Sequence, residues 1–542
     1  MLRRSVTLIR NITMRIVYYI AIVAVLLMRL NLAITRAFDP DEFAHLHWSY
    51  LLLTGNVPYR DFFFIILPAY QFFLFPIFLL GQSAIVPIAA RLLQLMLYIF
   101  TAILVYRVSL SFFKKQTGAL LSLLIFISFP MTIDKTIDIR PDMLMVAMIL
   151  LAMLTTNSFL IGLFTGLSLV IHPKIIFAMP MLAYLFATSS KKPRIAPTFI
   201  GFSVPVLLFF FYLAYQQVLP AAYTSIFRDA LVANTGKGHF SPFLALSPFP
   251  LVYLTQGGVS LPWLVNTAIW ILSAVGFIFL WIKQKRLGVG VALYFAFGIG
   301  LLFIFPVPFI QYFIPLTAMA SILAGNATVR SSTVIKVIIV ITVISSFFIQ
   351  YRERVTKGAS NAEQLQVLRD VLAVSRPDET FYDMVGSFIF RPDGYTICCH
   401  PYGEFIDKLS RPVPTLRESL VRRQTKFLVM DRVGFVFWKT PEPDLSFLLS
   451  NYLPTKYNKI YSLGQEFRCK NGACVPPAAT RSTNFFTILV PEKYTVTLEP
   501  NTAIVTIDGK EIRNGQTLDL AADLHRFSTS PAINNLRIQL VR

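Results

Sequence analysis

The chain has 542 residues, of which 55% are hydrophobic and only 14% charged, and its mean hydropathy is +0.62. This composition excludes an ordinary soluble enzyme and indicates a membrane protein. A net charge of +21 would suit nucleic acid, but residues 1–350 hold 24 Lys and Arg against 8 Asp and Glu, with the basic residues in short loops. Basic residues in such loops orient membrane helices, so no nucleic-acid partner is expected.

Eleven apolar segments predict membrane-spanning helices over the first 350 residues. They lie near 16–34, 86–108, 117–133, 143–156, 158–171, 175–188, 196–219, 263–282, 288–306, 308–326 and 333–350. No small-x-small cleavage site precedes Asp39, so the first segment is expected to be a retained anchor rather than a signal peptide.

The topology follows from the charges between these segments. With the basic N-terminal arm in the cytoplasm, every acidic residue of the region falls on the outer face: Asp39, Asp41, Glu42, Asp61, Asp134, Asp138, Asp142 and Asp229. This one-sided distribution predicts a cytoplasmic N-terminus and an extracytoplasmic, periplasmic C-terminal domain.

The first acidic residues of the chain, Asp39, Asp41 and Glu42, directly follow the first apolar segment. Carboxylates at the surface of a membrane protein are costly to desolvate and often mark a functional site. Two structural alternatives stay open: Asp39 is a helix cap or turn residue, or Asp41 is the N-cap of the next helix.

Residues 42–80 predict two interfacial helices on the outer face. The first is an amphipathic helix that begins at the acidic cluster and is stopped by Gly55. The second is the apolar run 63–80, which two prolines interrupt, so it predicts an interfacial or re-entrant helix rather than a further span. The count of eleven spans depends on that interpretation.

The C-terminal region has the composition of a soluble domain in two parts. Residues 351–465 mix helical periodicity with short apolar runs and predict an α/β domain. Residues 485–542 show alternating runs and the turn sequence Asp508-Gly509, which predict a small β domain. Segment 466–484 is the expected linker.

All four cysteines lie in this C-terminal region. Cys469 and Cys474 flank a short loop containing Gly472, a spacing that suits a disulfide in an oxidising compartment. Free thiols remain the alternative, and no cysteine or histidine spacing indicates a zinc site.

Several short motifs stand in a fixed order along the chain. They are the acidic pair, a helix, Gly-x-x-Pro-Tyr-Arg-Asp-Phe at 55–62, a Pro-rich interfacial helix, Arg91-Leu92, Arg140-Pro141-Asp142, Gly166 to Lys174, and the aromatic-rich Pro308 to Pro315. This order resembles the integral-membrane glycosyltransferases of the C fold (GT-C), in particular the protein O-mannosyltransferase and aminoarabinose transferase superfamily. The resemblance covers about residues 15–350.

The resemblance implies a function for the predicted architecture, a polytopic helical membrane protein with a C-terminal α/β plus β domain. In this family a sugar moves from a polyprenyl phosphate to an acceptor outside the cytoplasm. The chain is therefore expected to be a hexosyl or pentosyl transferase at the outer face of an inner membrane. The compact tail and the absence of a retention signal favour a bacterial membrane. Its acceptor would be a lipid, a glycan or a protein.

The same resemblance implies roles for ten residues. The catalytic set is Asp41 as base with Glu42 and Asp142, the donor phosphate ligands are Arg60, Arg140 and Lys174, and the substrate cavity holds His45, Tyr59, Asp61 and Tyr312. The need for a cofactor is left open; a divalent metal would have Asp41, Asp142 and His45 as candidate ligands. The family often has Thr or Ser before the lysine, where this chain has His172-Pro173.

Other interpretations compete with this one. A transporter or flippase of a lipid-linked sugar would also have many spans, although no internal repeat is evident. A membrane glycan polymerase or ligase would be an enzyme with a different acceptor. Among single residues, Asp61 could be a capping or salt-bridge residue, and Lys174 could extend to the membrane surface.

Overall fold

The computed structural model describes residues 2–189, 194–229, 260–304, 310–329, 331–395, 397, 409, 412–432, 436, 440–476 and 482–541. The chain forms two compact units. The helical unit comprises Met1–Ala37, Ile65–Ile77 and Pro87–Asn361, and the tail unit comprises Phe38–Phe64, Phe78–Val86 and Ala362–Arg542. The domain boundary expected near residue 350 differs from this division, because residues 38–64 belong with the C-terminal region.

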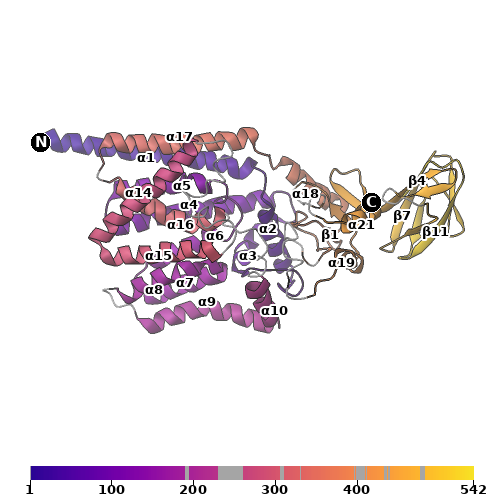
Figure 1. The fold of residues 1–542 in the computed structure, drawn as a ribbon, viewed down its shortest axis with the longest axis horizontal. Helices are drawn as coiled ribbons and strands as arrows, with labels where there is room; N and C mark the ends of the chain where they lie inside the picture. The colour runs from indigo at the N-terminus through magenta and orange to yellow at the C-terminus, as the bar shows by residue number, and fades with distance from the viewer. Residues whose placement is uncertain are drawn as a thin grey trace. The chain divides into compact units, whose positions relative to one another are not determined.

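A helix coincides with each of the eleven predicted spans (Figure 1). These helices are α1 (Leu2–Thr35), α4 (Val86–Phe113), α5 (Gln116–Ile127), α6 (Asp142–Leu154), α7 (Ser158–Ile171), α8 (Met179–Ala187), α9 (Ile195–Tyr215), α14 (Leu261–Lys283), α15 (Lys285–Ile304), α16 (Ile314–Ala327) and α17 (Thr333–Lys357). Five described segments are long and apolar enough to cross a membrane: Thr13–Thr35, Val86–Phe113, Ile195–Tyr215, Leu261–Lys283 and Thr333–Lys357.

Short helical turns connect several of these helices. They are α3 (Ala69–Phe73), η1 (Phe75–Leu80), η2 (Pro130–Thr132), η3 (Pro173–Phe177), α10 (Leu219–Tyr223), η4 (Thr224–Asp229) and η5 (Ile310–Phe313). The predicted interfacial helix over 63–80 is therefore two short pieces, α3 and η1, because Pro68 and Pro76 interrupt regular hydrogen bonding.

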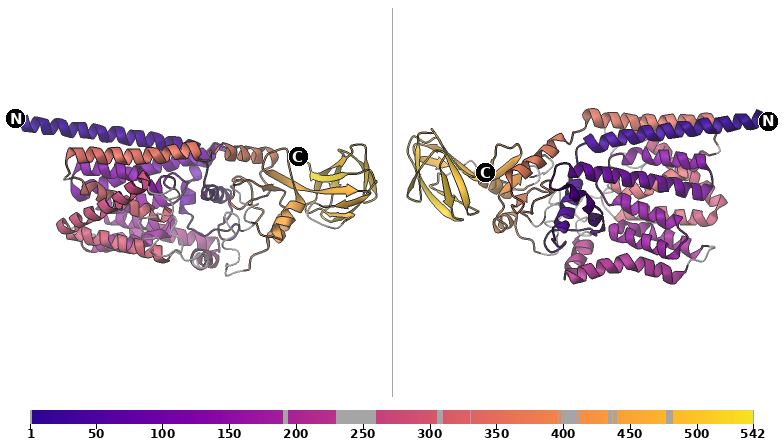
Figure 2. Two further views of the ribbon diagram at one scale, coloured as in Figure 1. Left: turned by 45° about the horizontal axis from the view of Figure 1, so that its top comes forward. Right: turned by 180° about the vertical axis from the view of Figure 1, so that it is seen from behind.

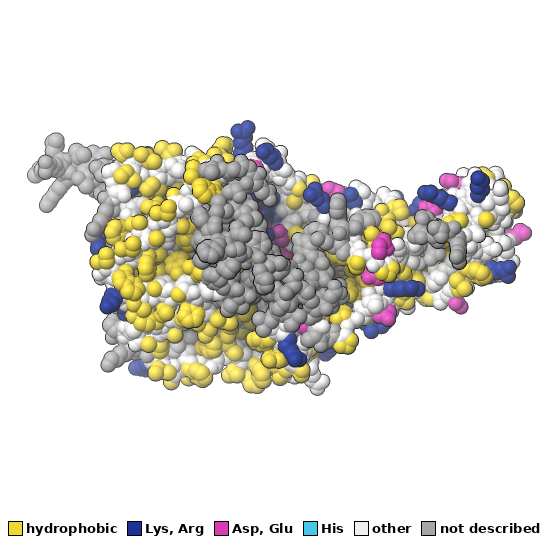
Figure 3. All heavy atoms as spheres, in the orientation of Figure 1, with side chains coloured by type: hydrophobic (Ala, Val, Ile, Leu, Met, Phe, Trp, Pro, Cys, Tyr) yellow, Lys and Arg dark blue, Asp and Glu magenta, His cyan; other side chains and the backbone are white. Residues whose placement is uncertain are grey.

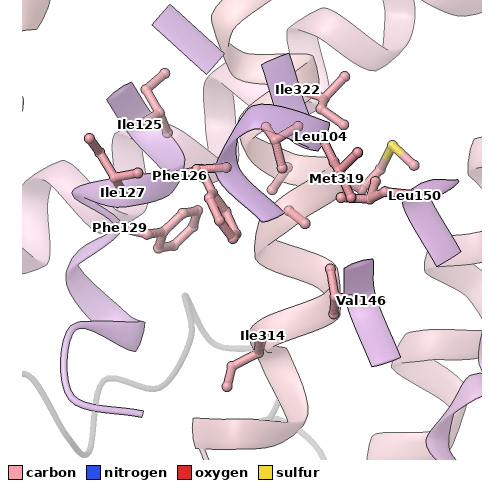
Figure 4. Packing of buried hydrophobic residues seen from close by; sticks show 14 of the residues in the cluster. Leu104, Ile125, Phe126, Ile127, Phe129, Val146, Leu150, Ile314, Met319 and Ile322 are labelled. Carbon is pink, nitrogen blue, oxygen red and sulfur yellow. The ribbon is translucent and has the colours of Figure 1, made fainter. Parts of the chain in front are cut away.

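Helix α16 is the centre of the helical unit. All of its residues from Ile314 to Asn326 are buried, and it contacts α5, α6 and α14. Met319 lies beside Leu104 of α4 and Leu150 of α6 (Figure 4). Apolar side chains that pack densely in this way exclude voids, so α16 fixes the positions of the helices around it.

Two helix pairs show how the sequence sets the packing. Helices α1 and α17 run side by side (Figure 2). Helices α7 and α9 approach through Gly166, where a Cβ would lie 2.4 Å from the carbonyl oxygen of Phe202. Small residues allow membrane helices to come this close. On the outside, hydrophobic side chains such as Ile20 and Leu208 are exposed over the helical unit, as expected for a lipid-facing surface (Figure 3).

The tail unit combines helices with two sheets. Its helices are α2 (Pro40–Leu53), α18 (Ala362–Val374), α19 (Leu416–Arg422) and α21 (Asp444–Asn451). Its strands are β1 (Phe381–Tyr382), β2 (Phe427–Val429), β3 (Tyr452–Pro454), β4 (Ile460–Lys470), β5 (Ala473–Val475), β6 (Phe485–Thr487), β7 (Glu492–Glu499), β8 (Ile504–Ile507), β9 (Lys510–Arg513), β10 (Thr517–Leu520), β11 (Leu524–Thr529) and β12 (Asn535–Leu540).

Strand β4 joins the two parts of the tail that the sequence separates. The first sheet runs β1-β2-β4-β12-β7-β10, and the second runs β6-β11-β8-β9. One end of β4 pairs with β2 and the other with β12, so the first sheet is continuous from the α/β part into the β part. Within the expected linker 466–484, β4 continues to Lys470 and β5 spans Ala473–Val475.

Two local predictions for the tail are confirmed. Cys469 and Cys474 form a disulfide across the β4–β5 turn. Asp508 and Gly509 connect β8 to β9 with φ angles of 47° and 81°, the positive values that a two-residue type I′ turn needs. Cys398 and Cys399 lie outside the described residues.

The side chain of His525 in β11 joins two turns of the β part. Its Nδ1 lies 2.6 Å from Asp508 and its Nε2 lies 2.9 Å from the carbonyl oxygen of Ala521. Burial by itself would lower the pKa of His525, but these two acceptors raise it above its ordinary value. Burial would raise the pKa of Asp508, but the hydrogen bond from His525 lowers it below its ordinary value.

We expect the pair to stabilise the tail most between about pH 4 and about pH 6.5, the ordinary values of the two groups. The contribution of His525 is complete below its unfolded pKa and is lost as pH rises through its folded pKa. The contribution of Asp508 is present above its unfolded pKa and is lost as pH falls through its folded pKa. The thermal unfolding midpoint of the full chain in detergent should therefore drop more in His525→Asn at pH 5 than at pH 9. An equal drop at both pH values would contradict this pairing.

Candidate active site

The start of α2 is held by a reciprocal capping arrangement. Asp39 is the N-cap, and its carboxylate accepts from the backbone N–H of Asp41 at 3.1 Å. Glu42, which is fully buried, accepts from the backbone N–H of Asp39 at 2.7 Å. The capping alternative for Asp39 is thus confirmed, and the N-cap alternative for Asp41 is wrong. Glu42 has a structural task, whereas Asp41 is half-buried in the first turn, where the helix dipole stabilises a carboxylate.

The segment after α2 folds into a tight turn around Asp61. Its carboxylate accepts from the backbone N–H of Val57 at 2.8 Å and from Arg60 at 2.9 Å (Nε) and 3.1 Å (Nη2). The hydrogen bond from Arg60 holds the pKa of the Asp61 carboxyl below its usual range. Tyr59 has a φ of 69°, a left-handed conformation that a bulky residue adopts only when the surroundings impose it. The salt-bridge alternative for Asp61 is therefore confirmed.

An aromatic series connects this turn to α2. The ring of His45 meets Trp48 edge to face at 5.6 Å, Trp48 meets Phe64 at 5.0 Å, and Phe64 meets Tyr59 at 5.5 Å. Edge-to-face aromatic pairs favour defined orientations. His45 and Tyr59 are therefore positioned by one packed aromatic group within the tail unit. The family resemblance assigns both residues to one substrate cavity.

In the helical unit, Asp142 and three other expected site residues form one cluster. This residue begins α6 and is fully buried. Its carboxylate binds Lys174 Nζ at 2.8 Å and Arg140 Nε at 3.3 Å. The Lys174 ammonium also lies 4.2 Å from the centre of the Tyr312 ring, a cation–π distance. Lys174 thus turns toward Asp142 and Tyr312 rather than extending away to the membrane surface.

His172 positions the backbone of Lys174. His172 is the N-cap of η3, and its Nδ1 accepts from the backbone N–H of Lys174 at 3.2 Å. Ser and Thr commonly do this task at helix starts. The cap thus holds Lys174 in the first turn of η3.

A second charged group, which the sequence did not indicate as a site, lies in the loop between α5 and α6. Arg36 at the end of α1 pairs with Asp138 and with Asp134 at 3.2 Å, and Arg354 of α17 pairs with Asp134 at 2.8 Å. Burial by itself would raise the pKa of Asp134, but Arg36 and Arg354 lower it. The sequence contains one indication of this group, because all of these residues follow predicted spans at their outer ends.

Arg29, six residues before the end of α1, forms hydrogen bonds to the same loop. It is fully buried and donates to the carbonyl oxygens of Ile127 (2.6 Å) and Ile133 (3.1 Å) and to the hydroxyl of Thr136 (2.8 Å). The rings of Tyr98 and Phe347 lie 4.6 and 5.1 Å from its guanidinium carbon. The loop that leads to Arg140 and Asp142 is thus anchored by α1 and α17.

Within the described ranges, no three His, Cys, Asp or Glu side chains are grouped closely enough to hold a metal ion. Of the candidate metal ligands, Asp41 and His45 belong to the tail unit and Asp142 to the helical unit. Of the aromatic-rich motif, Pro308 and Phe309 lie outside the described residues, whereas Tyr312 in η5 is part of the Asp142 cluster.

No protein-family model and no curated protein sequence matches the chain. Among solved structures it is similar to ArnT from Cupriavidus metallidurans bound to undecaprenyl phosphate, with a TM-score of 0.58 and 12% identity, over 82% of this chain and 97% of that one. The apo state of ArnT gives a TM-score of 0.55 at 11% identity, over 85% and 98%. The oligosaccharyltransferase AglB from Archaeoglobus fulgidus is less similar, with a TM-score of 0.45 and 11% identity, over 85% of this chain and 74% of that one.

At 11–12% identity, the likeness to ArnT shows a shared fold, and it extends over 97% of the ArnT chain. The likeness covers 82% of the present chain, which is more than the residues up to Asn361, so it extends into the C-terminal region. The chain has the C fold of the integral-membrane glycosyltransferases.

Proposed function

We propose that the protein is a glycosyltransferase that moves a sugar from a polyprenyl phosphate to an acceptor outside the cytoplasm. The observation that carries the proposal is the extent of the likeness to ArnT, whose structure holds undecaprenyl phosphate. A lipid-linked donor fits a helical unit with exposed apolar side chains, because a polyprenyl tail needs an apolar surface. The proposed location is a bacterial inner membrane, with the N-terminus in the cytoplasm and the tail outside.

The Asp142 cluster supports a role in binding the donor phosphate. It contains two cations, Arg140 and Lys174, and one carboxylate, so its formal charge is positive. Buried charge is costly unless it is compensated, and a phosphate would compensate it through charge-assisted hydrogen bonds. Arg140 and Lys174 are the proposed ligands, Asp142 orients them, and Tyr312 supports Lys174. Arg60, in the tail unit, remains the third proposed ligand of the donor phosphate.

Asp41 is the proposed general base. Glu42 is fully buried and occupied by the cap, whereas Asp41 lies half-buried one residue earlier and is not the cap. In the proposed step, the acceptor hydroxyl or amine attacks the anomeric carbon as its proton passes to the Asp41 carboxylate. The bond from that carbon to the phosphate oxygen breaks, and its electron pair leaves with the polyprenyl phosphate. His45, Tyr59 and Asp61 are proposed to shape the substrate cavity.

The first test is the reaction itself. Purified protein incubated with a radiolabelled polyprenyl-phosphate sugar should release polyprenyl phosphate and pass the label to acceptor or water. In a parallel sample of liposomes with the same donor, the intact lipid should stay on its original leaflet. Movement of intact donor across the bilayer without release of polyprenyl phosphate would instead support a flippase. Transfer only to a growing glycan would identify a polymerase or ligase.

Asp41→Asn should abolish most turnover without unfolding the protein. Asparagine keeps the size of the side chain but cannot accept the proton, and loss of a general base typically costs about 10²–10⁴ in rate. The measurement is kcat for release of polyprenyl phosphate, with Asp370→Asn in α18 as the matched control. Near wild-type turnover in Asp41→Asn would show that Asp41 is not the base and leave Glu42 and Asp142 as the candidates.

Lys174→Met should weaken donor binding. A hydrogen bond to a charged group contributes about 1.5–3 kcal/mol, which corresponds to roughly 10- to 150-fold in Kd. Binding of polyprenyl phosphate by the detergent-solubilised variant is the measurement, and Lys174→Arg is the control because it keeps the charge. Because the substitution removes one partner of buried Asp142, the unfolding midpoint must be recorded too. Unchanged affinity with a lowered midpoint would show that Lys174 is structural and does not bind phosphate.

A further inference from the structure

His47 lies on α2 in a position that the proposed reaction does not use. Its side chain is completely buried. Nδ1 lies 2.8 Å from the carbonyl oxygen of Ile389, and Nε2 lies 2.8 Å from a carboxylate oxygen of Asp393. The two partners are separated from His47 by more than 340 residues in sequence, and all three belong to the tail unit.

These contacts bear on the protonation state of the imidazole. A neutral imidazole has one N–H donor and one acceptor nitrogen, whereas an imidazolium has two donors. The carbonyl oxygen of Ile389 can only accept, so Nδ1 carries the proton of that hydrogen bond. With Asp393 as a carboxylate, Nε2 would carry a second proton, and the geometry suits an imidazolium whose buried charge the ion pair compensates.

The segment that contains Ile389 and Asp393 is itself tightly held. Phe388 meets the His47 ring edge to face at 4.9 Å, and Phe390 meets Tyr50 of α2 at 5.2 Å. Hydrophobic contact and the ion pair thus act on the same face of α2. Burial of the Asp393 side chain, which is 3% exposed, keeps water from weakening the pair.

One further charged side chain faces this arrangement. Arg423 donates to the backbone oxygen of Asp393 at 2.8 Å and to that of Asp61 at 3.3 Å. Asp393 is thus the point where α2 and the turn that carries Tyr59 and Arg60 are both joined to the C-terminal part of the tail unit. The carboxylate contacts His47, and the carbonyl contacts Arg423.

We propose that His47 is a positioning residue, which as an imidazolium bound to Ile389 and Asp393 fixes α2 and thereby sets the aim of Asp41. His47 lies six positions after Asp41, which is about 9 Å along a helix at 1.5 Å per residue. A rigid helix transmits any rotation or shift at His47 to its first turn. The inference rests on the proposed function of Asp41 as base, but the state of His47 can be measured without it.

The chain contains a matched control for this arrangement. His525 also places Nδ1 and Nε2 against a carboxylate and a backbone carbonyl, in the β part of the tail. Replacing His525 removes the same kind of ion pair without touching α2 or the segment around Asp393. Any effect common to both histidines reflects general stability, and any effect specific to His47 reflects the position of α2.

The experiment compares wild type with His47→Gln, Asp393→Asn and His525→Gln as full-length protein in detergent. In ¹⁵N-histidine-labelled wild type at neutral pH, NMR should show both ring nitrogens of His47 protonated, and Asp393→Asn should remove one of these protons. Hydrogen exchange of α2 amides should rise in His47→Gln and Asp393→Asn but not in His525→Gln. For release of polyprenyl phosphate from the labelled donor, kcat should fall roughly 10- to 100-fold in both variants with donor KM within about threefold.

The outcomes separate this inference from the proposed function. A neutral His47 ring, or unchanged α2 exchange in both variants, overturns the inference whatever the enzyme does. A lowered unfolding midpoint with unchanged kcat also overturns it, because His47 would then only stabilise the fold. If wild type releases no polyprenyl phosphate, the proposed function fails, and the NMR and exchange results still decide whether His47 holds α2. Should His47→Gln fail to fold, Asp393→Asn carries the same tests.

Discussion

Asp134, Asp138 and Asp142 in the helical unit each have a cation beside them, and much of the structure around the loop before α6 follows from these ion pairs. Asp138 and Asp134 bind Arg36, and Asp142 binds Lys174. Leaving any of these charges unpaired would cost several kcal/mol, so the helices that supply the partners are fixed in position. Arg36 comes from α1 and Lys174 from η3, which means that the loop before α6 is located by elements distant in sequence. The candidate phosphate site at Asp142 therefore also depends on the ion pairs of Arg36 with Asp134 and Asp138, which lie outside the proposed reaction.

The two acidic residues at the start of α2 show how neighbouring carboxylates take different roles. Glu42 is buried, completes the capping box with Asp39, and is unavailable for proton transfer without loss of that cap. Asp41 is one residue away on a different side of the helix and is not the cap. The difference arises from helix geometry, since only the N3 side chain can reach back to the N-cap. The arrangement gives a physical reason to assign the base to Asp41.

The positions of the apolar helices could be predicted because apolar length is a local signal, and a helix lies at each expected span. The Asp508-Gly509 turn was predictable for the same reason. Long-range contacts were not. The pairing of Lys174 with Asp142 joins residues 32 apart, and that of His47 with Asp393 joins residues 346 apart. Nor could the sequence show that β4 is shared by both parts of the tail, because its pairing with β2 and with β12 is made by residues distant in sequence. Nor did any local sign indicate that residues 38–64 share a compact unit with residues 362–542.

The composition of the tail unit has a consequence for how the protein is made. Residues 38–64 must wait for partners that begin at residue 362, with about 300 residues of chain between them. At about 5–20 residues per second, synthesis of that intervening chain takes roughly 15 to 60 s. During this interval α2 has emerged without the strands and turns that complete its surroundings. The segment that carries the candidate base is thus synthesised well before the partners with which it is assembled, so a nascent chain that ends before residue 362 holds Asp41 without the structure around it.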